Sequence, residues 1–175
     1  FTRDGGATFP YRGTGLEIPT LDEAFARFPA ERFLIEIKQA APPIEAEVLD
    51  AIARAGMHAR VCLASFDDAV VARVRALDPE MCTSAGVLEV IDLALRPVED
   101  LLRDGVKAEA VQLPPDVLGA PLVTAPLVAK LAALGIETHV WTIDDADEMR
   151  ALLDLGVEGI ITDRPDVLRD VIASR

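Results

Sequence analysis

The chain has 175 residues, of which 51% are hydrophobic and 27% charged, and its formal net charge is −13. This composition is typical of a folded domain with a sizeable core and excludes a disordered chain. The negative charge and the lack of a Lys/Arg cluster argue against nucleic acid and anionic membranes as partners, and no apolar run is long enough for membrane insertion. A small anionic substrate stays compatible, because a single lysine or a bound cation can set the local field.

The start of the sequence bears on the cellular compartment of the protein, and the spacing of its cysteines bears on their chemical state. The chain begins at Phe1 without an initiator methionine and shows no signal-peptide pattern. We expect a cytoplasmic protein, and we leave a periplasmic or secreted one open because an N-terminal segment is expected to be missing. Cys62 and Cys82 lie in apolar segments without the spacing of metal ligands, so buried free thiols are expected.

The predicted elements alternate along one domain that spans residues 1–175. Residues 1–18 are expected to be loop-like because Gly and Pro interrupt every pattern, whereas residues 19–175 are expected to form βα units. Thr20, followed by Glu23 three residues later, predicts a capping box at the first helix. Strands are expected at 33–38, 60–65, 81–85, 110–113, 137–143 and 159–162. Helices are expected at 20–28, 44–56, 67–77, 87–104 with a break at Pro97, 124–134, 144–155 and 165–173.

This alternation predicts an α/β fold with a parallel sheet. Two layouts fit, an open doubly wound sheet and a (β/α)₈ barrel. No Gly-rich turn follows any strand, so the dinucleotide-binding fingerprint is missing, and polar residues gather at the carboxyl ends of strands, where barrel active sites form. We therefore predict an incomplete TIM (β/α)₈-type barrel with about six parallel βα units instead of eight. Its open sheet edges predict self-association or marginal stability.

The strand at 33–38 carries the candidate site. Side chains alternate along a strand, so Glu36 and Lys38 share one face with Leu34 below them. Two opposite charges at the end of a covered strand are costly to desolvate unless they are paired or bind something. An internal ion pair or a solvated strand end is one interpretation. The other is a metal-binding Glu36 with Lys38 facing an anionic substrate.

Five sequence blocks occur in order along the chain. They are I-P-T-L-D-E-A at 18–24, I-E-I-K at 35–38, S-F at 65–66, V-W-T-I-D at 140–144 and G-I-I-T-D-R-P-D at 159–166. Together they resemble the glycerophosphodiester phosphodiesterases, over about residues 4–168. The resemblance implies a TIM barrel that hydrolyses glycerophosphodiesters to glycerol 3-phosphate and an alcohol, with Mg²⁺ or Ca²⁺ held by carboxylates.

The resemblance also implies roles for individual residues. Glu36 matches a metal ligand, Lys38 a phosphate-facing catalytic residue, and Trp141 a residue beside the glycerol moiety. These roles agree with chemistry, because oxygen ligands suit Mg²⁺ and Ca²⁺ and positive charge stabilises phosphate oxygens. Ser65 is a candidate substrate-binding residue, with bonding to the local backbone as the alternative.

One departure from the family affects the expected activity. The family's H-R-G and H-D segments supply two histidines as general acid and base, and neither segment occurs here. His58 is expected at the surface, and His139 in a barrel layer beneath Trp141. Because acid–base groups contribute about 10²–10⁴-fold each, we expect the isolated chain to be inactive or nearly so. The alternatives are a non-catalytic binding module or remnant, and a related barrel phospholipase or phosphodiesterase.

The remaining polar candidates have structural interpretations. Asp163 is expected to cap the last helix, and the acidic pairs at 67–68 and 144–145 are expected to stabilise helix starts. Gln112 is expected near the barrel mouth as a hydrogen-bonding residue.

Overall fold

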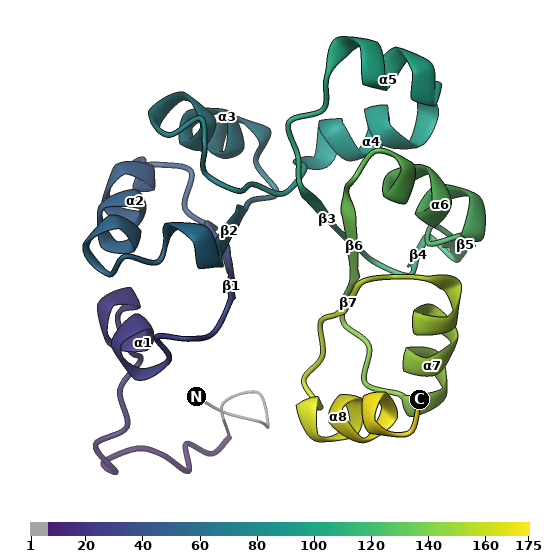
Figure 1. The fold of residues 1–175 in the computed structure, drawn as a ribbon. Coiled ribbons are helices and arrows are strands. Elements are labelled where there is room, and N and C mark those ends of the chain that lie inside the picture. Colours follow the sequence, from purple (N-terminus) through teal and green to yellow (C-terminus); the bar gives the residue numbers. More distant parts are fainter. Residues whose placement is uncertain (1–6) are drawn as a thin grey trace.

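The structure, a computed structural model, describes residues 7–175. Parallel strands form an open arc with most of the helices on its outer side (Figure 1). The strands are β1 (Phe33–Glu36), β2 (Val61–Ala64), β3 (Ala110–Leu113), β4 (Asp116–Val117), β5 (Ala120–Pro121), β6 (Glu137–Val140) and β7 (Gly159–Ile160). The helices are α1 (Leu21–Arg27), α2 (Glu45–Arg54), the 3₁₀ helix η1 (His58–Arg60), α3 (Asp68–Leu77), α4 (Val87–Leu95), α5 (Val98–Asp104), α6 (Ala125–Ala133), α7 (Ala146–Leu155) and α8 (Pro165–Ala173).

Two parallel sheets make up the arc. β1 pairs with β2, and β3, β6 and β7 follow one another in a second sheet. A bridging segment, residues 82–85, joins the sheets: the Ser84 N–H donates to the Leu63 carbonyl at 2.9 Å, and the Ala85 N–H donates to the Ala110 carbonyl at 2.8 Å. The strand predicted at 81–85 is therefore present only as this bridging segment with isolated β-bridges. The order β1, β2, bridging segment, β3, β6, β7 is that of an incomplete parallel α/β barrel, which confirms the predicted fold class.

Four strands, β1, β2, β6 and β7, are shorter than the sequence predicts, and the shortening of β1 and β6 affects the site. β1 ends at Glu36 and β6 at Val140. The N–H groups of Ile37 and Trp141 still donate to carbonyls of the neighbouring strands, at 2.8 and 3.1 Å. Past Ile37 the chain leaves the ladder and enters a loop at the barrel mouth, whereas beyond Trp141 the Ile143 N–H donates once more, to the Ile161 carbonyl at 3.1 Å. Lys38 therefore lies on a loop, two residues beyond the end of β1.

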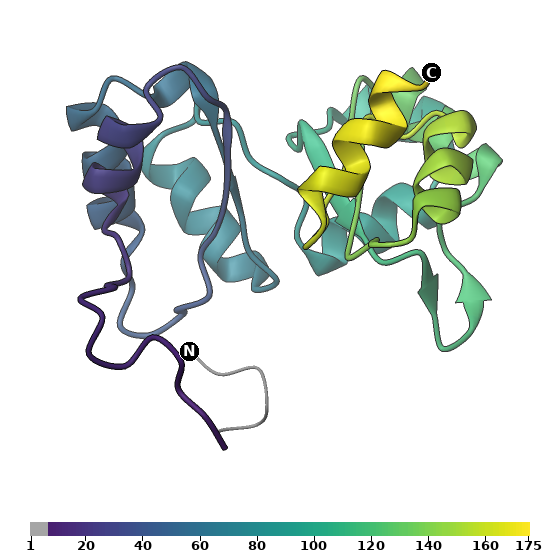
Figure 2. The same ribbon diagram turned by 90° about the horizontal axis from the view of Figure 1, so that it is seen from below.

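The antiparallel hairpin β4–β5 is not predicted by the sequence. Its turn places Leu118 and Gly119 at φ 53° and 80°, and the Gly119 N–H donates to the Asp116 carboxylate at 2.9 Å. The hairpin projects away from the helices (Figure 2). Its strands contain two residues each, which is too short for the period-two alternation that identifies a strand in a sequence.

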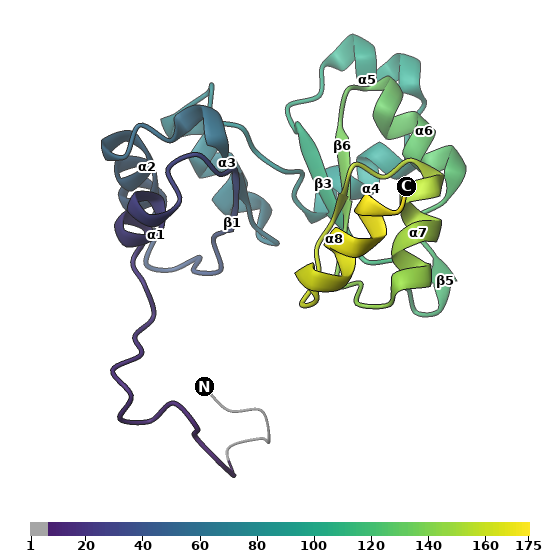
Figure 3. The same ribbon diagram turned by 60° about the horizontal axis from the view of Figure 1, so that its bottom comes forward.

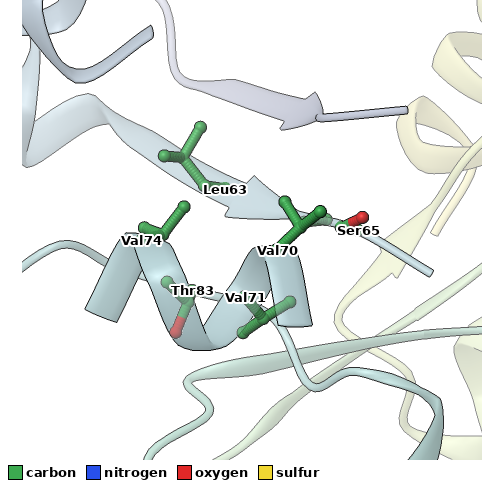
Figure 4. Close-up of a pocket in the computed structure, with 7 residues that line it drawn as sticks. Leu63, Ser65, Val70, Val71, Val74 and Thr83 are labelled. Carbon is green, nitrogen blue, oxygen red and sulfur yellow. The ribbon is translucent and has the colours of Figure 1, made fainter. Parts of the chain in front are cut away.

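The buried apolar side chains form two clusters, one in each part of the arc. The first lies between β1, β2 and helices α1–α3 and includes Ile52 and Leu63. Figure 4 shows Val70 and Val74 of α3 pointing toward the strand that carries Leu63. The second cluster lies between β3, β6 and the later helices and includes Met149. Each set of strands is thus covered by its own helices.

The helix starts confirm several predictions made from the sequence. Thr20 and Glu23 form the capping box of α1, and the Thr20 N–H donates to the Glu23 carboxylate at 2.8 Å. Asp67 and Asp145 are the N-cap residues of α3 and α7. The predicted break at Pro97 separates α4 from α5. No helix of residues 7–175 is long and apolar enough to span a bilayer.

The prediction for Asp163 is wrong. The N-cap residue of α8 is Arg164, and no side chain caps this helix. The Arg164 N–H donates to the Thr162 hydroxyl at 2.9 Å, and the Asp163 N–H donates to the Asp144 carboxylate at 2.9 Å. Pro165 in the first turn has no N–H to satisfy, so a side-chain cap contributes less here.

Candidate active site

A cavity of about 840 Å³ opens at the carboxyl ends of the strands. The residues at its strand-end side are Glu36, Lys38, Ser65, Gln112, Trp141 and Thr142. The structure thus brings together all four residues that the sequence predicts for the site, Glu36, Lys38, Ser65 and Trp141. Their proposed roles stay predictions.

Glu36 and Lys38 form an ion pair in this cavity. The Lys38 ammonium lies 2.8 Å from the Glu36 carboxylate, and the two side chains are 78% and 33% exposed. Such an exposed pair is worth about 0–1 kcal/mol. Because the ammonium has three donors, it can keep this contact and still bind an anion, or exchange one for the other at little cost. The two interpretations of this strand end, an ion pair and a ligand site, are therefore compatible.

An aromatic pair forms another part of the cavity wall. The rings of Phe66 and Trp141 meet edge to face, with centroids 6.0 Å apart and an interplanar angle of 89°. Phe66 is 59% exposed, which is unusual for a phenylalanine. The sequence alone indicates no role for Phe66 beyond its place in the S-F block at 65–66. Its place immediately after a strand end was the signal that could have identified it.

Ser65 has local hydrogen-bond partners. Its hydroxyl donates to the Ile37 carbonyl at 2.8 Å and accepts from the Asp67 N–H at 3.1 Å. The side chain is buried and ties the end of β1 to the start of α3. These bonds favour the backbone-bonding interpretation, although Ser65 also lines the cavity.

A polar layer lies deeper in the barrel, beneath Trp141. The His139 ring is 3.3 Å from the Gln112 amide and 3.2 Å from the Glu137 carboxylate, and Gln112 also bonds to the Ser84 hydroxyl. His139 does not line the cavity, which agrees with the predicted lower layer. Gln112 lies at the boundary between this layer and the cavity, as expected for a residue near the mouth.

The remaining histidine, His58, lies outside the cavity. His58 begins η1 at the surface, where its ring contacts the Asp78 carboxylate at 2.9 Å. Within residues 7–175, neither histidine lines the cavity. The described part of the chain therefore provides no imidazole as general acid or base at the site.

The two cysteines differ from the prediction. Cys62 and Cys82 are free thiols, as expected, but they are only partly buried. They lie opposite one another on β2 and the bridging segment. The pKa of the Cys82 thiol is raised, because it hydrogen-bonds to Cys62 and is withdrawn from water.

The cavity offers few oxygen ligands for a metal ion. Glu36 is the single carboxylate among the residues that line the cavity in the described part of the chain. Residues 7–175 contain no group of three or more His, Cys, Asp or Glu side chains arranged to hold a metal ion. A carboxylate oxygen is the ligand type that Mg²⁺ and Ca²⁺ prefer, but one carboxylate does not build a site for either. The described residues do not form the predicted cation site by themselves.

Comparison with known proteins identifies the family. The model of the glycerophosphoryl diester phosphodiesterase family matches residues 2–167. The chain belongs to this family. A Mycobacterium tuberculosis protein named "Probable glycerophosphodiester phosphodiesterase 2" is 39% identical over 171 residues, which cover 93% of this chain and 63% of that protein. A glycerophosphodiester phosphodiesterase of Caldanaerobacter subterraneus is 29% identical over 97% of this chain and 68% of its own length.

Solved structures of phosphodiesterases share the fold. A glycerophosphodiester phosphodiesterase from Parabacteroides distasonis superposes with a TM-score of 0.71 at 22% identity, covering 90% of this chain and 65% of that one. A phosphodiesterase from Oleispira antarctica, solved in complex with the product sn-glycerol-3-phosphate, superposes with a TM-score of 0.64 at 18% identity. That match covers 89% of this chain and 61% of the other. The chain thus spans about two thirds of the length of these relatives.

Proposed function

We propose that this chain forms the substrate-binding part of a site that hydrolyses glycerophosphodiesters to glycerol 3-phosphate and an alcohol. The main support is the meeting of Glu36, Lys38 and Trp141 around one cavity, at the end of the strands where barrel enzymes bind their substrates. The family membership and the product-bound structure of the Oleispira antarctica phosphodiesterase support the same substrate class.

In this proposal each residue has a defined task. The Lys38 ammonium binds a phosphate oxygen and stabilises the negative charge that grows there during hydrolysis. The rings of Trp141 and Phe66 flank the carbon backbone of the glycerol. Ser65 connects the end of β1 to the start of α3 beside the substrate. Glu36 provides one oxygen ligand for a divalent cation, Mg²⁺ or Ca²⁺.

We further propose that residues 7–175 bind the substrate without turning it over. The cavity contains a cation and an aromatic wall, but no histidine of the described chain reaches it. Removing an acid–base pair lowers a rate by several orders of magnitude, since each group contributes about 10²–10⁴-fold.

A hydrolysis assay tests both statements. Glycerophosphocholine is incubated with the 175-residue chain and with a chimera that places the front segment of the Mycobacterium tuberculosis relative before it. We expect glycerol 3-phosphate from the chimera and none from the chain alone. In the chimera, Lys38→Met should lower kcat about 10²–10³-fold, because it removes a charge that stabilises the transition state. The matched control is Lys107→Met, at an exposed position outside the cavity.

The results separate the alternatives. Hydrolysis by the unextended chain would contradict the proposed need for further catalytic groups. A folded chimera that binds glycerol 3-phosphate but hydrolyses nothing would favour a non-catalytic binding module. A chimera that hydrolyses intact phospholipids in preference to glycerophosphodiesters would favour a related barrel phospholipase.

A further inference from the structure

The two cysteines form a pair that the proposed function does not use. Leu63 of β2 and Thr83 of the bridging segment are direct partners in a parallel β-bridge. Cys62 and Cys82 each precede one of these partners, so they lie side by side on the opposite face. Leu63 packs in the first apolar cluster, whereas Ala64, on the same face as Cys62, lines the cavity. The cysteine pair therefore faces the inner side of the arc.

The spacing of the pair fits a disulfide. Neighbouring strands lie about 4.8 Å apart, and the Cα atoms of bonded cysteines are usually about 4.4–6.8 Å apart. The register is fixed by two bonds of 2.9 Å, from the Leu63 N–H to the Cys82 carbonyl and from the Ser84 N–H to the Leu63 carbonyl. The two thiols already hydrogen-bond to each other. The native register thus brings the two sulfur atoms together.

The cysteine pair is separate from the candidate active site. Cys62 is the second residue of β2, near the amino end of the strand, whereas the cavity opens at the carboxyl ends. Neither cysteine lines that cavity. Both are free and only partly buried, so a small reagent in solution can reach them.

The two thiols are chemically unequal. The pKa of the Cys62 thiol is lowered, because the Cys82 thiol donates a hydrogen bond to it. Burial and the carboxylates of Glu109 and Glu137 oppose this effect, and Arg32 adds to it. The pKa of the Cys82 thiol is raised, because its proton is held in the bond to Cys62 and because it is withdrawn from water. Since the thiolate is the nucleophile in disulfide exchange, Cys62 is suited to attack and Cys82 to follow.

We propose that Cys62 and Cys82 are a thiol–disulfide site, at which a small disulfide such as glutathione disulfide converts the pair into an intramolecular disulfide. The Cys62 thiolate attacks one sulfur of glutathione disulfide, whose S–S bond breaks, and the leaving glutathione thiolate takes up the proton that Cys62 lost. Cys82 then gives up its proton and attacks the Cys62 sulfur, which releases the second glutathione as a thiol. The two cysteines are oxidised by two electrons, and one glutathione disulfide is reduced to two glutathiones.

The disulfide would act at the joint between the two parts of the arc. In Figure 3 one segment runs from α3 to α4 between the two groups of elements. The bridging segment within it pairs through isolated bridges instead of a continuous ladder. A bond between Cys62 and Cys82 closes a loop over residues 62–82, which contains α3, and fixes the bridging segment covalently to β2. Oxidation therefore stabilises the least paired part of the arc.

A redox titration of the 175-residue chain tests the proposal. The chain is equilibrated with mixtures of reduced and oxidised glutathione, quenched with acid, and analysed by mass spectrometry. We expect the intact mass to fall by two hydrogen atoms, and trypsin to release a peptide with Cys62 joined to a peptide with Cys82. The same titration is repeated in urea that unfolds the chain. The equilibrium constant for the disulfide should be at least about tenfold larger in the folded chain, because the fold holds the thiols together.

Thermal melting gives a second measure of the same quantity. By linkage, a tenfold preference for the disulfide in the folded chain raises the melting temperature of the oxidised form by about 3–6 °C for a chain of this size. Reduction of the oxidised chain should restore the lower value.

Two matched variants separate the roles of the thiols. Cys62→Ser and Cys82→Ser should each accumulate a single glutathione adduct and form no intramolecular disulfide. Cys82→Ser should react several-fold faster than Cys62→Ser, because the serine hydroxyl can still donate to the Cys62 thiolate. Should either variant fail to fold, the alanine variant is measured in its place. The reverse order of rates would overturn the assignment of Cys62 as the attacking thiol.

Each outcome of the titration decides the proposal. A cross-linked peptide that forms more readily in the folded chain supports it. Stable glutathione adducts on the unsubstituted chain, without loss of two hydrogen atoms, overturn it because the thiols then do not reach each other. Dimers linked through cysteine overturn it as well. Equal equilibrium constants in the folded chain and in urea show that the fold does not bring the thiols together, and also overturn it.

Discussion

The two parts of the arc contribute different chemistry to one cavity. The N-terminal part, β1 and β2 with α1–α3, supplies the charged residues Glu36 and Lys38. The C-terminal part, β3, β6 and β7 with α4–α8, supplies Trp141 and an apolar wall. This wall consists of the α4 side chains that line the cavity, Val87, Val90, Ile91 and Ala94. Each part has its own apolar cluster, and Figure 2 shows two groups of elements joined by a connecting segment. The position of the charged residues relative to the apolar wall therefore depends on how the two parts are held together.

Arg75 lies at the junction between these parts. Its side chain is 15% exposed, and its guanidinium donates to the Thr83 hydroxyl and to the Glu89 carboxylate, both at 2.8 Å. It thereby connects α3, the bridging segment and α4. The Glu89 carboxylate also accepts the Gly86 N–H at the start of α4, at 3.3 Å. The position of the apolar wall is thus coupled to a helix of the N-terminal part.

The largest expected effect comes from truncating one core at a time. Ile52→Ala in the N-terminal cluster and Met149→Ala in the C-terminal cluster each remove a side chain that is 1% exposed or less. Each should cost about 2–5 kcal/mol of the free energy of unfolding. Because the clusters are separate, Ile52→Ala should shift the urea transition seen by circular dichroism and leave the Trp141 fluorescence transition in place. Met149→Ala should shift the fluorescence transition.

The same experiment tests the predicted marginal stability and self-association. Leu77→Ala, at an exposed position of α3, is the control and should change stability by less than about 0.5 kcal/mol. Association through the free edges of β1 and β7 would make the midpoints depend on protein concentration. A monodisperse monomer with one coincident transition for both probes would contradict the view of two separately stabilised parts.

An intermediate effect is expected at the junction. Arg75→Leu leaves the partly buried Glu89 carboxylate without its cation and should cost about 2 kcal/mol. Unlike Ile52→Ala, it should shift the circular dichroism and fluorescence transitions together, because the side chain contacts both parts. Arg103→Leu, which removes an exposed arginine of α5, is the control. A shift confined to one probe would show that Arg75 stabilises α3 alone.

Much of the fold could be predicted because local rules and tertiary packing agree. β3 and α8 have the predicted boundaries, and Thr20 caps α1 as its spacing with Glu23 indicates. The bridging segment was predicted as a strand but retains only isolated bridges, since its pairing depends on neighbours far away in sequence. The β4–β5 hairpin has too few residues for any periodic signal.

The site was predictable where strand alternation determines it. Glu36 and Lys38 share a face with Leu34, and all three line the cavity. Their mutual contact was one of two open interpretations, because a sequence does not show whether a lysine faces its neighbour or a ligand. The apolar wall was missed because the pattern of α4 also fits an ordinary core helix. The structure shows that Leu93 is the residue of α4 that packs inward, which leaves the other apolar side chains of this helix exposed.

The smallest expected effect is a pH dependence of stability that is larger in the N-terminal part. Glu45 of α2 is 2% exposed and accepts hydrogen bonds from the Arg73 guanidinium of α3 at 2.7 and 2.9 Å. These bonds hold the pKa of Glu45 below its ordinary value of 4.5. A lowered pKa means that the unfolded chain takes up the proton first, so the pair stabilises the fold above pH 4.5 and loses this contribution as the pH falls through the lower, folded value.

Urea titrations with both probes at pH 7 and at a series of values below 4.5 measure this loss. Acid should move the circular dichroism transition of the N-terminal part more than the Trp141 transition, because the C-terminal carboxylate with a lowered pKa, Asp166, is exposed and paired only with Arg164. In Arg73→Met the Glu45 carboxylate loses the bonds that lower its pKa, so the extra acid sensitivity should decrease at the expense of stability at neutral pH, leaving the smaller contribution of Glu23, whose pKa is lowered by its bonds from Thr20. Equal acid sensitivity of the two transitions in the unsubstituted chain would show that this ion pair does not distinguish the two parts, and that their stabilities are linked through the bridging segment.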